Sequence, residues 1–367
     1  MPLSFLFTDL ILIISILILA FVLSRRLVRK AKKSQAESEK HSLARHTKNP
    51  LLSPKEEHWW QATGTFNPAA IADEHGKIHL LYRATGSDGI SRFGYSASKD
   101  GIEFNDFVPY PVFALDTPRS NVPRKLQRYD FGLYPSGGSW GGAEDPRIVK
   151  IDDRLYVTFN AFDGWDFIRI AAVSIKEKDF FEKKWNWSKP LFISPKGEIH
   201  KNWVLFPKKI NGKFAILHSV SPNVQIDYVD RLEDLTTGRN VIKSRFAQEP
   251  RAKGWDTMRR GVGPPPLLTE KGWLVLYHAI DKKDPDRYKL GALLLDLNNP
   301  QNVLAKAKNP LLVPDEWYEN DWKPGVIYAC GAVIKNDTLF VYYGGGDKHV
   351  CMASAPLSKI FSQLERV

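Results

Sequence analysis

The sequence predicts an all-β protein, a five-bladed β-propeller, preceded by a single N-terminal transmembrane helix. The first observation is a short apolar strand that occurs five times and ends in a polar or small residue: Arg83, Asn160, Ser219, His278 and Gly344. The steps between these closing residues are 77, 59, 59 and 66 residues. Self-similarity of this kind indicates repeated hairpin units that stack around a shared core, and the unit has the size of a propeller blade.

The second observation is the length of the remaining chain. Residues 49–367 are enough for five such units, with turn sequences such as KINGK and TEKG between the strands. The phrase NPLL occurs at Asn49–Leu52 and again at Asn309–Leu312, as expected where the first and last blades of a closed ring complete one another. In a propeller the innermost strands surround a central channel, so we expect the equivalent strand ends to converge on one pocket.

The third observation is an apolar run over residues 3–24, in which Thr8 and Asp9 lie near one end and Asp9 is the one charged residue; the run is long enough to span a bilayer. No Lys or Arg precedes it, which favours an uncleaved anchor at residues 1–24 over a signal peptide or a buried core helix. Residues 25–48 hold nine Lys or Arg and two Glu, most of the net charge of +11. We predict that they form a basic juxtamembrane linker that contacts anionic lipid and leaves the propeller on the cytoplasmic side of the membrane.

The composition disfavours several other classes of protein. Two cysteines, Cys330 and Cys351, give no disulfide framework. The sequence has no HExxH motif, no Cys/His metal spacing, no EF-hand loop and no P-loop, so we expect no metal ion. A basic stripe interleaved with exposed aromatic residues is also missing from the domain, which argues against nucleic-acid binding.

One carboxylate stands out when the blades are aligned by their inner hairpins. Asn67, Asp145, Phe206 and Pro264 fall at the same point, the mouth of the first inner strand. Only blade two places an acid there, and Pro146 restricts the backbone beside it. We therefore predict Asp145 as the catalytic residue, flanked by Glu144 and Arg147. The alternative is that Asp145 only forms a turn.

Cationic and hydroxyl side chains are expected around this acid. Three closing residues, Arg83, Asn160 and His278, belong to the set, as does Asp347 three residues beyond the last closing residue. Further candidates are Arg92, Lys201, Arg259, Arg260, Tyr288 and Lys289. One acid ringed by cations suits an anionic reactant, phosphate above all. Asp163 and Asp281 also follow closing residues, but a turn role fits them equally well.

Several stretches in this order resemble one known family. They are NPAAI, LLYRATG, GGAEDPRI, HKNWVLFP, GVGPPPLLTEKGWLVLYHAID and LFVYYGGGDK, and with others they cover nearly all of residues 49–360. The chain resembles glycoside hydrolase family 130, the mannoside phosphorylases. The resemblance implies a five-bladed propeller and an inverting reaction in which inorganic phosphate, the co-substrate, cleaves a β-mannoside and yields α-mannose 1-phosphate. It implies no other cofactor.

The resemblance also implies roles for single residues. Asp145 matches the general acid, which acts through a sugar hydroxyl in that family. Asn67, Arg83 and Asp347 match its sugar- and phosphate-site residues, and His278 and Tyr288 its phosphate-side partners. With the charged residues around the acid added, we expect Asn67, Arg83, Arg92, Arg147 and Asp347 to bind substrate and Lys201, His278 and Tyr288 to bind phosphate. The chain departs from the family where Lys201-Asn202 and Ser219 replace arginine-containing patterns. These changes weaken the expected grip on phosphate, and Arg259 or Arg260 is a candidate to compensate.

Three alternative functions stay open. An inverting hydrolase needs a second carboxylate to activate water, for which Asp347, Asp281 and Glu198 are candidates. A mannosyltransferase that uses a nucleotide sugar fits a membrane-borne acceptor. A non-catalytic, membrane-tethered sugar-binding propeller is the alternative from another class. A retaining glycosidase of the invertase or arabinanase type is disfavoured, because blade one offers Asn67 where that chemistry needs a carboxylate.

Aromatic side chains on the loops are candidates to stack on a sugar, whose C–H face is apolar. They are Trp59, Trp60, Trp140, Trp165 and Trp203. The alternative for each is packing between blades.

Overall fold

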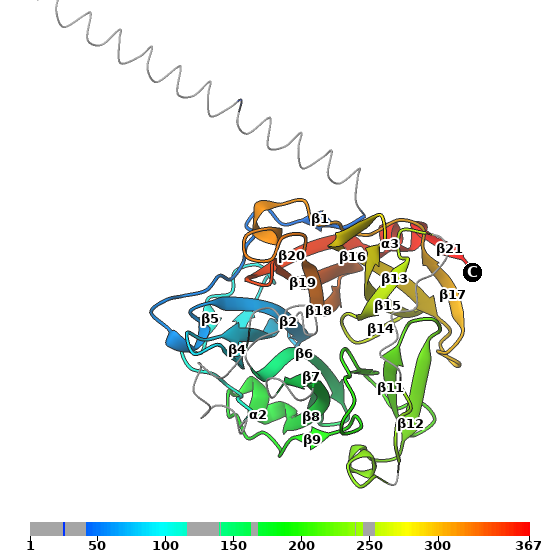
Figure 1. Ribbon diagram of the computed structural model, residues 1–367, viewed down its shortest axis with the longest axis horizontal. Coiled ribbons are helices and arrows are strands. Elements are labelled where there is room, and N and C mark those ends of the chain that lie inside the picture. Colours follow the sequence, from blue (N-terminus) through cyan, green and yellow to red (C-terminus); the bar gives the residue numbers. More distant parts are fainter. Residues whose placement is uncertain are drawn as a thin grey trace, which may run out of the picture.

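The computed structural model describes residue 25 and residues 42–115, 139, 141–162, 168–238, 240–244 and 254–367. Within these residues the protein is mostly β, and its strands form five antiparallel units around a common axis (Figure 1). This is the predicted five-bladed arrangement. No helix in the described part is both long enough and apolar enough to cross a bilayer. The predicted anchor, residues 1–24, lies outside the described residues and stays a prediction.

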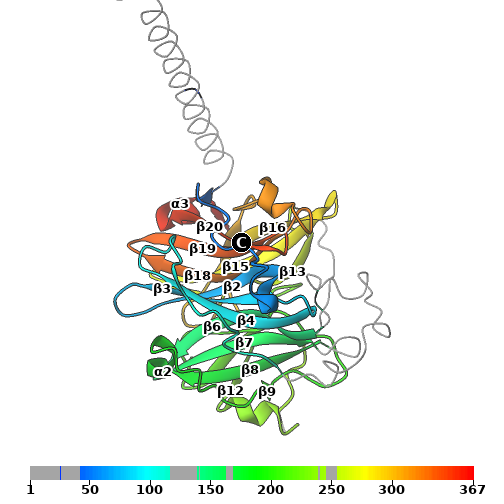
Figure 2. The same cartoon turned by 90° about the vertical axis from the view of Figure 1, so that its left-hand side faces the viewer.

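Blades one and two share one continuous sheet. Blade one consists of β2 (Gly64–Ala72), β3 (Ile78–Thr85), β4 (Ile90–Ser98) and β5 (Asp106–Phe107). Blade two consists of β6 (Gly141–Ile151), β7 (Arg154–Phe162), β8 (Ile168–Lys176) and β9 (Leu191–Phe192). A short parallel pairing of β4 with β6 joins the two blades. Seen from the side, blades five, one and two follow one another from top to bottom (Figure 2).

The other three blades complete the ring. Blade three holds β10 (Val204–Leu205), β11 (Phe214–Ser219) and β12 (Gln225–Val229). Blade four holds β13 (Met258–Val262), β14 (Leu267–Thr269), β15 (Gly272–Asp281), β16 (Asp284–Leu295), β17 (Val303–Ala307) and β21 (Leu364–Arg366). Blade five holds β18 (Ile327–Lys335), β19 (Thr338–Gly345), β20 (His349–Pro356) and β1 (Ala44–Arg45). The described helices are short: η1 (Trp59–Gln61), α2 (Glu177–Phe181), η4 (Leu232–Leu235), η5 (Trp317–Glu319) and α3 (Leu357–Ser362).

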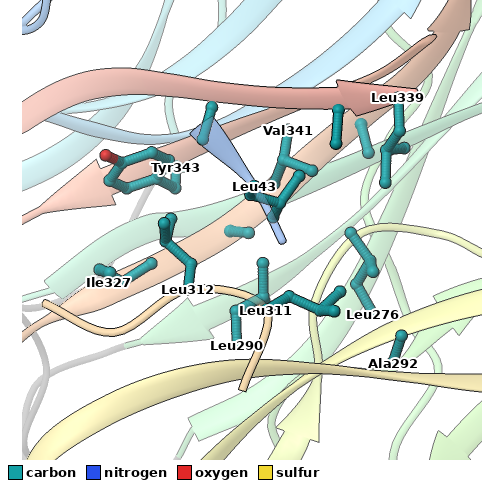
Figure 3. Packing of buried hydrophobic residues seen from close by; sticks show 14 of the residues in the cluster. Leu43, Leu276, Leu290, Ala292, Leu311, Leu312, Ile327, Leu339, Val341 and Tyr343 are labelled. Carbon is teal, nitrogen blue, oxygen red and sulfur yellow. The ribbon is translucent and has the colours of Figure 1, made fainter. Parts of the chain in front are cut away.

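Both ends of the described chain add outer strands to the ring. Strand β1 pairs with β20 of blade five, and β21 pairs with β17 of blade four. Residues 44 and 45, which the sequence analysis assigns to the linker, are therefore paired with the propeller. Leu43 beside them is buried in the cluster between blades four and five, next to Val341 and Leu311 (Figure 3). Burying a leucine side chain contributes roughly 1.5–3 kcal/mol.

The two NPLL segments lie at equivalent places. Leu52 forms an antiparallel bridge with Val350 in β20, and Leu312 forms one with Leu290 in β16. Each segment thus runs beside the third strand of its blade, one in blade five and the other in blade four. The repeated phrase marks the passage from one blade to the next.

A β-bulge near the start of the inner strand determines which side chain faces the axis. In blade one, Phe66 pairs with Arg83 and the next pair is Ala69 with Leu81, so Asn67 falls in the bulge. Its φ is 47°, a left-handed conformation that Asn and Asp tolerate better than other non-glycine residues. Bulges redirect a side chain and recur beside active sites.

Blades two and three repeat this geometry. Asp145 occupies the bulge of blade two with φ 50°. In blade three, Val204 pairs with Leu217, which places Asn202, with φ 66°, two residues before the first paired residue, as in blades one and two. The predicted alignment through Phe206 is therefore wrong by four residues. In blade four the corresponding bulge lies between Arg259 and Gly261, ahead of the predicted Pro264.

Candidate active site

Residues of blades one and two hold Asp145, the predicted catalytic acid. Its side chain is 5% exposed. Oδ1 accepts hydrogen bonds from Asn67 Nδ2 at 2.8 Å and from Arg83 Nη1 at 3.1 Å, and Oδ2 accepts one from Asn160 Nδ2 at 3.1 Å. The backbone carbonyl of Asp145 accepts a bond from Arg147 at 2.8 Å. The carboxyl group is thus fixed in position by residues of blades one and two.

Arg83 joins two buried acids. Besides Asp145, its guanidinium donates to Glu144 Oε1 at 2.9 Å, to Ser139 Oγ at 3.0 Å and to Ser91 Oγ at 2.9 Å. Arg83 is 1% exposed and Glu144 0% exposed. A buried charge set of this kind is costly unless every member is paired, and here each of the three ionised groups has a charged partner. The arrangement favours a role for this site over a purely structural one.

Asn67 offers a free acceptor beside the acid. Its Nδ2 donates to Asp145, but its Oδ1 is buried and has no hydrogen-bond partner within the described residues. A buried unsatisfied carbonyl is unfavourable by about 1–3 kcal/mol. A sugar hydroxyl that donates to Oδ1 would satisfy it.

Arg147 and Asn202 extend the cluster into blades three and five. Arg147 Nη2 donates to Asn202 Oδ1 at 2.9 Å, and the hydroxyl of Tyr328 donates to the same oxygen at 2.6 Å. The Tyr328 ring stacks on His278, with centroids 4.1 Å apart and an angle of 11°. Arg147 therefore positions the Asp145 backbone and Asn202 while lying 1% exposed.

His278 is neutral and has a defined proton. Burial, together with the Arg147 charge, lowers the pKa of His278 to about 3. Its Nε2 accepts the backbone N–H of Ala329 at 2.9 Å, so the ring proton resides on Nδ1. That Nδ1 is buried without a hydrogen-bond partner in the part of the chain that the structure describes. His278 thus presents one unused donor.

Two lysines lie near these acids. Lys323 lies on the segment before β18 and forms an ion pair with Asp347 Oδ2 at 3.2 Å. Lys201 has no such partner among the described residues. Burial lowers the pKa of Lys201, while the charges of Glu144 and Asp145 act in the opposite direction. The positive charges of Arg83 and Lys323 also lower the pKa of Lys201, so these three cations lie close enough to repel one another.

A further cation lies on blade four. Arg260 falls in the bulge of β13, and its Nε donates to the hydroxyl of Tyr288 at 3.1 Å. The Arg260 carbonyl accepts a bond from Asn202 Nδ2 at 3.3 Å. No hydrogen bond of its two Nη groups to a described residue is present. Arg260 therefore brings a partly unused guanidinium next to Tyr288, a predicted phosphate-binding residue.

The charge around Asp145 keeps it ionised. Burial would raise the pKa of Asp145, but Arg83, Arg147, the Asn67 hydrogen bond and Lys201 together hold it below its ordinary value. A carboxyl group in this state cannot donate a proton until the balance of charge changes. An anion that binds among the cations makes this change, because it offsets their effect on the carboxylate.

Comparison with known proteins identifies the family. The family model described as beta-1,4-mannooligosaccharide phosphorylase matches residues 53–366. The chain belongs to glycoside hydrolase family 130. A 1,2-beta-oligomannan phosphorylase of Thermoanaerobacter sp. is 36% identical over 329 residues, with 87% of this chain and 98% of the relative covered. A beta-1,2-mannobiose phosphorylase of Listeria innocua is 35% identical, with 88% and 99% covered.

Solved structures support the same family 130 fold. The Listeria innocua beta-1,2-mannobiose phosphorylase, solved with beta-1,2-mannobiose, has a TM-score of 0.66 at 25% sequence identity. The match covers 88% of this chain and 98% of that chain. The predicted membership of the mannoside phosphorylase family is confirmed, and with it the prediction of an enzyme of the glycoside phosphorylase class.

The structure brings most of the family-derived candidates together. Asn67, Arg83, Asp145, Arg147, Lys201, His278 and Asp347 belong to one network of hydrogen bonds and charges. Tyr288 joins this network through its effect on Lys323. Arg92 does not, because it is ion-paired with Asp88 at 2.6 Å and lies over the Trp59 ring.

Other candidates lie elsewhere. Arg259 is ion-paired with Asp256 at 2.8 Å, and Lys289 with Asp284 at 2.8 Å. The Asp281 side chain accepts the backbone N–H of Lys283, a turn contact. Asp163 lies outside the described residues.

Two of the predicted sugar-stacking tryptophans are core residues. Trp203 is 1% exposed and packs between the rings of His200 and His218. Trp60 is 2% exposed, and its Nε1 donates to the Pro109 carbonyl. The stacking prediction is wrong for both because no ligand can reach these rings. Trp59 is 55% exposed, and Trp140 and Trp165 lie outside the described residues.

Sequence reasoning missed three members of the network. Asn202 was noted only as a departure from the family, although the Asn/Asp pattern two residues before the inner strand could have identified it. Tyr328 closes no strand and lies opposite Gly344 in blade five. Lys323 lies on a connecting segment outside the repeat, so no periodic signal marks it.

Proposed function

We propose that the protein is an inverting β-mannoside phosphorylase that releases the terminal mannosyl unit of β-1,2-linked mannooligosaccharides as α-mannose 1-phosphate. Family membership supports the reaction class. The linkage is supported by three relatives that are named as phosphorylases of β-1,2-linked oligomannan or mannobiose and are 32–36% identical to this chain.

The observation that carries the proposal is a set of unused donors next to Asp145. His278 presents an N–H with no acceptor, Lys201 an ammonium with no ion pair, and Arg260 two guanidinium nitrogens with no described hydrogen bond. Phosphate is the small anion that accepts several charge-assisted hydrogen bonds at once. Arg260 also supplies a positive charge in place of the arginine that Ser219 replaces. The Ser219 hydroxyl itself donates to the Ser221 carbonyl.

The reaction needs no protein base. A phosphate oxygen attacks the anomeric carbon and the bond from that carbon to the leaving oxygen breaks. The leaving oxygen takes up a proton that originates on Asp145 and passes through a sugar hydroxyl. Phosphate is already a nucleophile, so only an acid is required. Phosphate bound near Lys201 offsets the charge that keeps Asp145 ionised, and Asp145 thereby acquires its proton in the complex.

Hydrolysis fits the described residues less well. An inverting hydrolase needs a second carboxylate roughly 6.5–9.5 Å from the acid to activate water. Of the predicted candidates, Glu198 is 56% exposed and bonds with His200, and Asp281 lies in a turn. Asp347 is paired with Lys323, which favours a role in binding over one as a base.

The decisive experiment incubates the protein with β-1,2-mannobiose in the presence and absence of phosphate and follows the product anomer by NMR. We expect α-mannose 1-phosphate only when phosphate is present. Asp145→Asn is expected to abolish turnover. His278→Gln is expected to raise KM for phosphate by about 5- to 150-fold, because the loss of one hydrogen bond to a charged group weakens binding by about 1–3 kcal/mol.

Release of free mannose at the same rate without phosphate would instead favour the hydrolase. Transfer of mannose from a nucleotide sugar, with no cleavage of mannobiose, would favour the transferase. Sugar binding that Asp145→Asn leaves intact, with no turnover by the unaltered protein, would favour the non-catalytic propeller.

A further inference from the structure

A cavity of about 620 Å³ opens at the seam between blades five and one. This volume is in the range of small-molecule sites. Its lining includes Ser53, Thr85, Trp322, Asp347, Lys348 and His349. Asp347 belongs to the active-site network, so the cavity is continuous with the catalytic site and leads away from it.

Trp322, unlike the buried Phe66, is the exposed aromatic residue of this lining. Its side chain is 61% exposed, and it directly precedes Lys323, which pairs with Asp347. A single exposed tryptophan is common on protein surfaces. Trp322 lies on the wall of a cavity that begins at Asp347, so a ligand that fills this cavity can contact its ring.

The segment that carries Trp322 is anchored on both sides. The backbone N–H of Lys323 donates to the Gly346 carbonyl at 2.9 Å. Asp321 is ion-paired with Lys348 and hydrogen-bonded to His349 Nε2, each at 2.9 Å. The indole is therefore exposed on a backbone that is already fixed, and a fixed platform binds a ligand with a smaller loss of entropy than a mobile one.

The chemistry of the wall suits a sugar. An indole ring offers an apolar face for the C–H groups of a pyranose ring, while its edge stays polar. Ser53, Thr85 and Lys348 provide hydroxyl and ammonium groups to the same cavity, and these can bind the sugar hydroxyls. Ser53 already bonds to His349 and Lys348 to Asp321, and each keeps the capacity for a further hydrogen bond to a sugar.

The direction of the cavity agrees with the proposed reaction. Inversion places the nucleophile and the leaving group on opposite faces of the sugar ring. The unused donors of Lys201, His278 and Arg260 come from blades three and four, whereas the cavity lies between blades five and one. The leaving chain is thus directed toward the cavity.

We infer that this cavity is a binding site for additional units of a β-mannosyl chain, with Trp322 as its stacking platform, so that substrates of three or more units are preferred over the disaccharide. The inference rests on the proposed function, because it assumes that the reacting mannosyl unit lies between Asp145 and Asp347.

The test compares kcat/KM for β-1,2-mannotriose and β-1,2-mannobiose with phosphate in the unaltered protein, in Trp322→Ala and in Trp317→Ala. Trp317 is the matched control: it is also 61% exposed and on the same segment, but it does not line the cavity. In the unaltered protein we expect the ratio of kcat/KM for the triose to that for the biose to exceed one. This ratio should fall by about threefold to tenfold in Trp322→Ala, the size that one aromatic contact allows. In Trp317→Ala it should be unchanged.

An unchanged ratio in Trp322→Ala would overturn the inference, as would an equal fall with both substrates or the same fall in Trp317→Ala. A second arm measures binding of both sugars to Asp145→Asn by calorimetry without phosphate. If no phosphate-dependent cleavage occurs, the proposed function fails, but this arm still decides the role of the cavity. The role of the cavity is supported if the triose binds more tightly than the biose and Trp322→Ala abolishes this difference. Equal affinities for the two sugars, or no binding, would refute it.

Discussion

The charge state of Asp145 is determined by neighbours from several blades. Arg83, Arg147 and Lys201 favour its ionised form, although burial acts against it. The predicted acid therefore depends on a second ligand to become protonated. Under the proposed mechanism, this dependence would connect phosphate binding to proton transfer.

Removal of one cation tests this connection. Lys201→Met is expected to raise the pKa of Asp145, because the loss of a positive charge favours the neutral carboxyl group. A carboxyl-carbon NMR titration measures this, with Asp145→Asn to assign the resonance. Lys289→Met is the control, since Lys289 is ion-paired with Asp284 and should leave the pKa of Asp145 unchanged. A fall in that pKa on loss of Lys201 would contradict the argument.

The sequence repeat made a site residue predictable where that residue falls at an equivalent point of each blade. Asp145, Arg83 and His278 fall at repeated strand ends, and the structure brings all three into one network. Arg92 has the right charge, but its partner Asp88 lies four residues away on the same hairpin, a local contact that no repeat reveals. Trp203 follows the bulged Asn202 and is buried between blades, a tertiary effect that its residue type cannot indicate.

At the scale of elements, the inner-strand bulge is the device that builds the site. It turns Asn67 and Asp145 to the axis, and both residues have positive φ. The strand repeat and the turns were predictable from sequence. The bulge register in blade three was not, because the prolines that follow it suggested a different alignment. Gly344 closes its strand without a side chain, and the Asn67 side chain occupies the space where a Cβ of residue 344 would lie.

Gly344→Ala tests this contact between blades. The added Cβ would overlap Asn67 Oδ1, so we expect displacement of Asn67, a loss of about 1–3 kcal/mol in the free energy of unfolding and at least about a tenfold fall in kcat. Urea unfolding and steady-state kinetics measure the two effects. In the Asn67→Ala background the same substitution should cost less stability. Equal costs in both backgrounds would show that the overlap is not the cause.

On the scale of the whole molecule, the ring is closed by the first described strand. Arg45 in β1 donates to Glu319 Oε1 at 2.7 Å and Oε2 at 2.9 Å, and Tyr343 donates to the same carboxylate at 2.8 Å. Glu319 is 0% exposed. The repeated NPLL phrase predicted that the chain ends complete one another, but no sequence pattern identified Arg45 as a buried partner, because it lies within a run of basic residues.

Two shortened proteins separate this role from that of the preceding residues. A protein that begins at residue 42 should unfold at the same urea concentration as the full chain. One that begins at residue 49 loses Leu43 and Arg45 and leaves Glu319 buried without its cation, which costs about 3–5 kcal/mol. Equal stability of the two would contradict this account.

If residues 1–24 form the predicted anchor, the full chain should sediment with membranes and the protein that begins at residue 42 should not.

The contact between Arg45 and Glu319 has a mechanical consequence. Glu319 begins the segment that presents Trp322 to the cavity and Lys323 to Asp347. Residues 44 and 45 therefore connect to this segment through the ion pair, in addition to the pairing of β1 with β20. A displacement of this end of the chain would thus alter the position of Trp322 and Lys323 beside the catalytic residues.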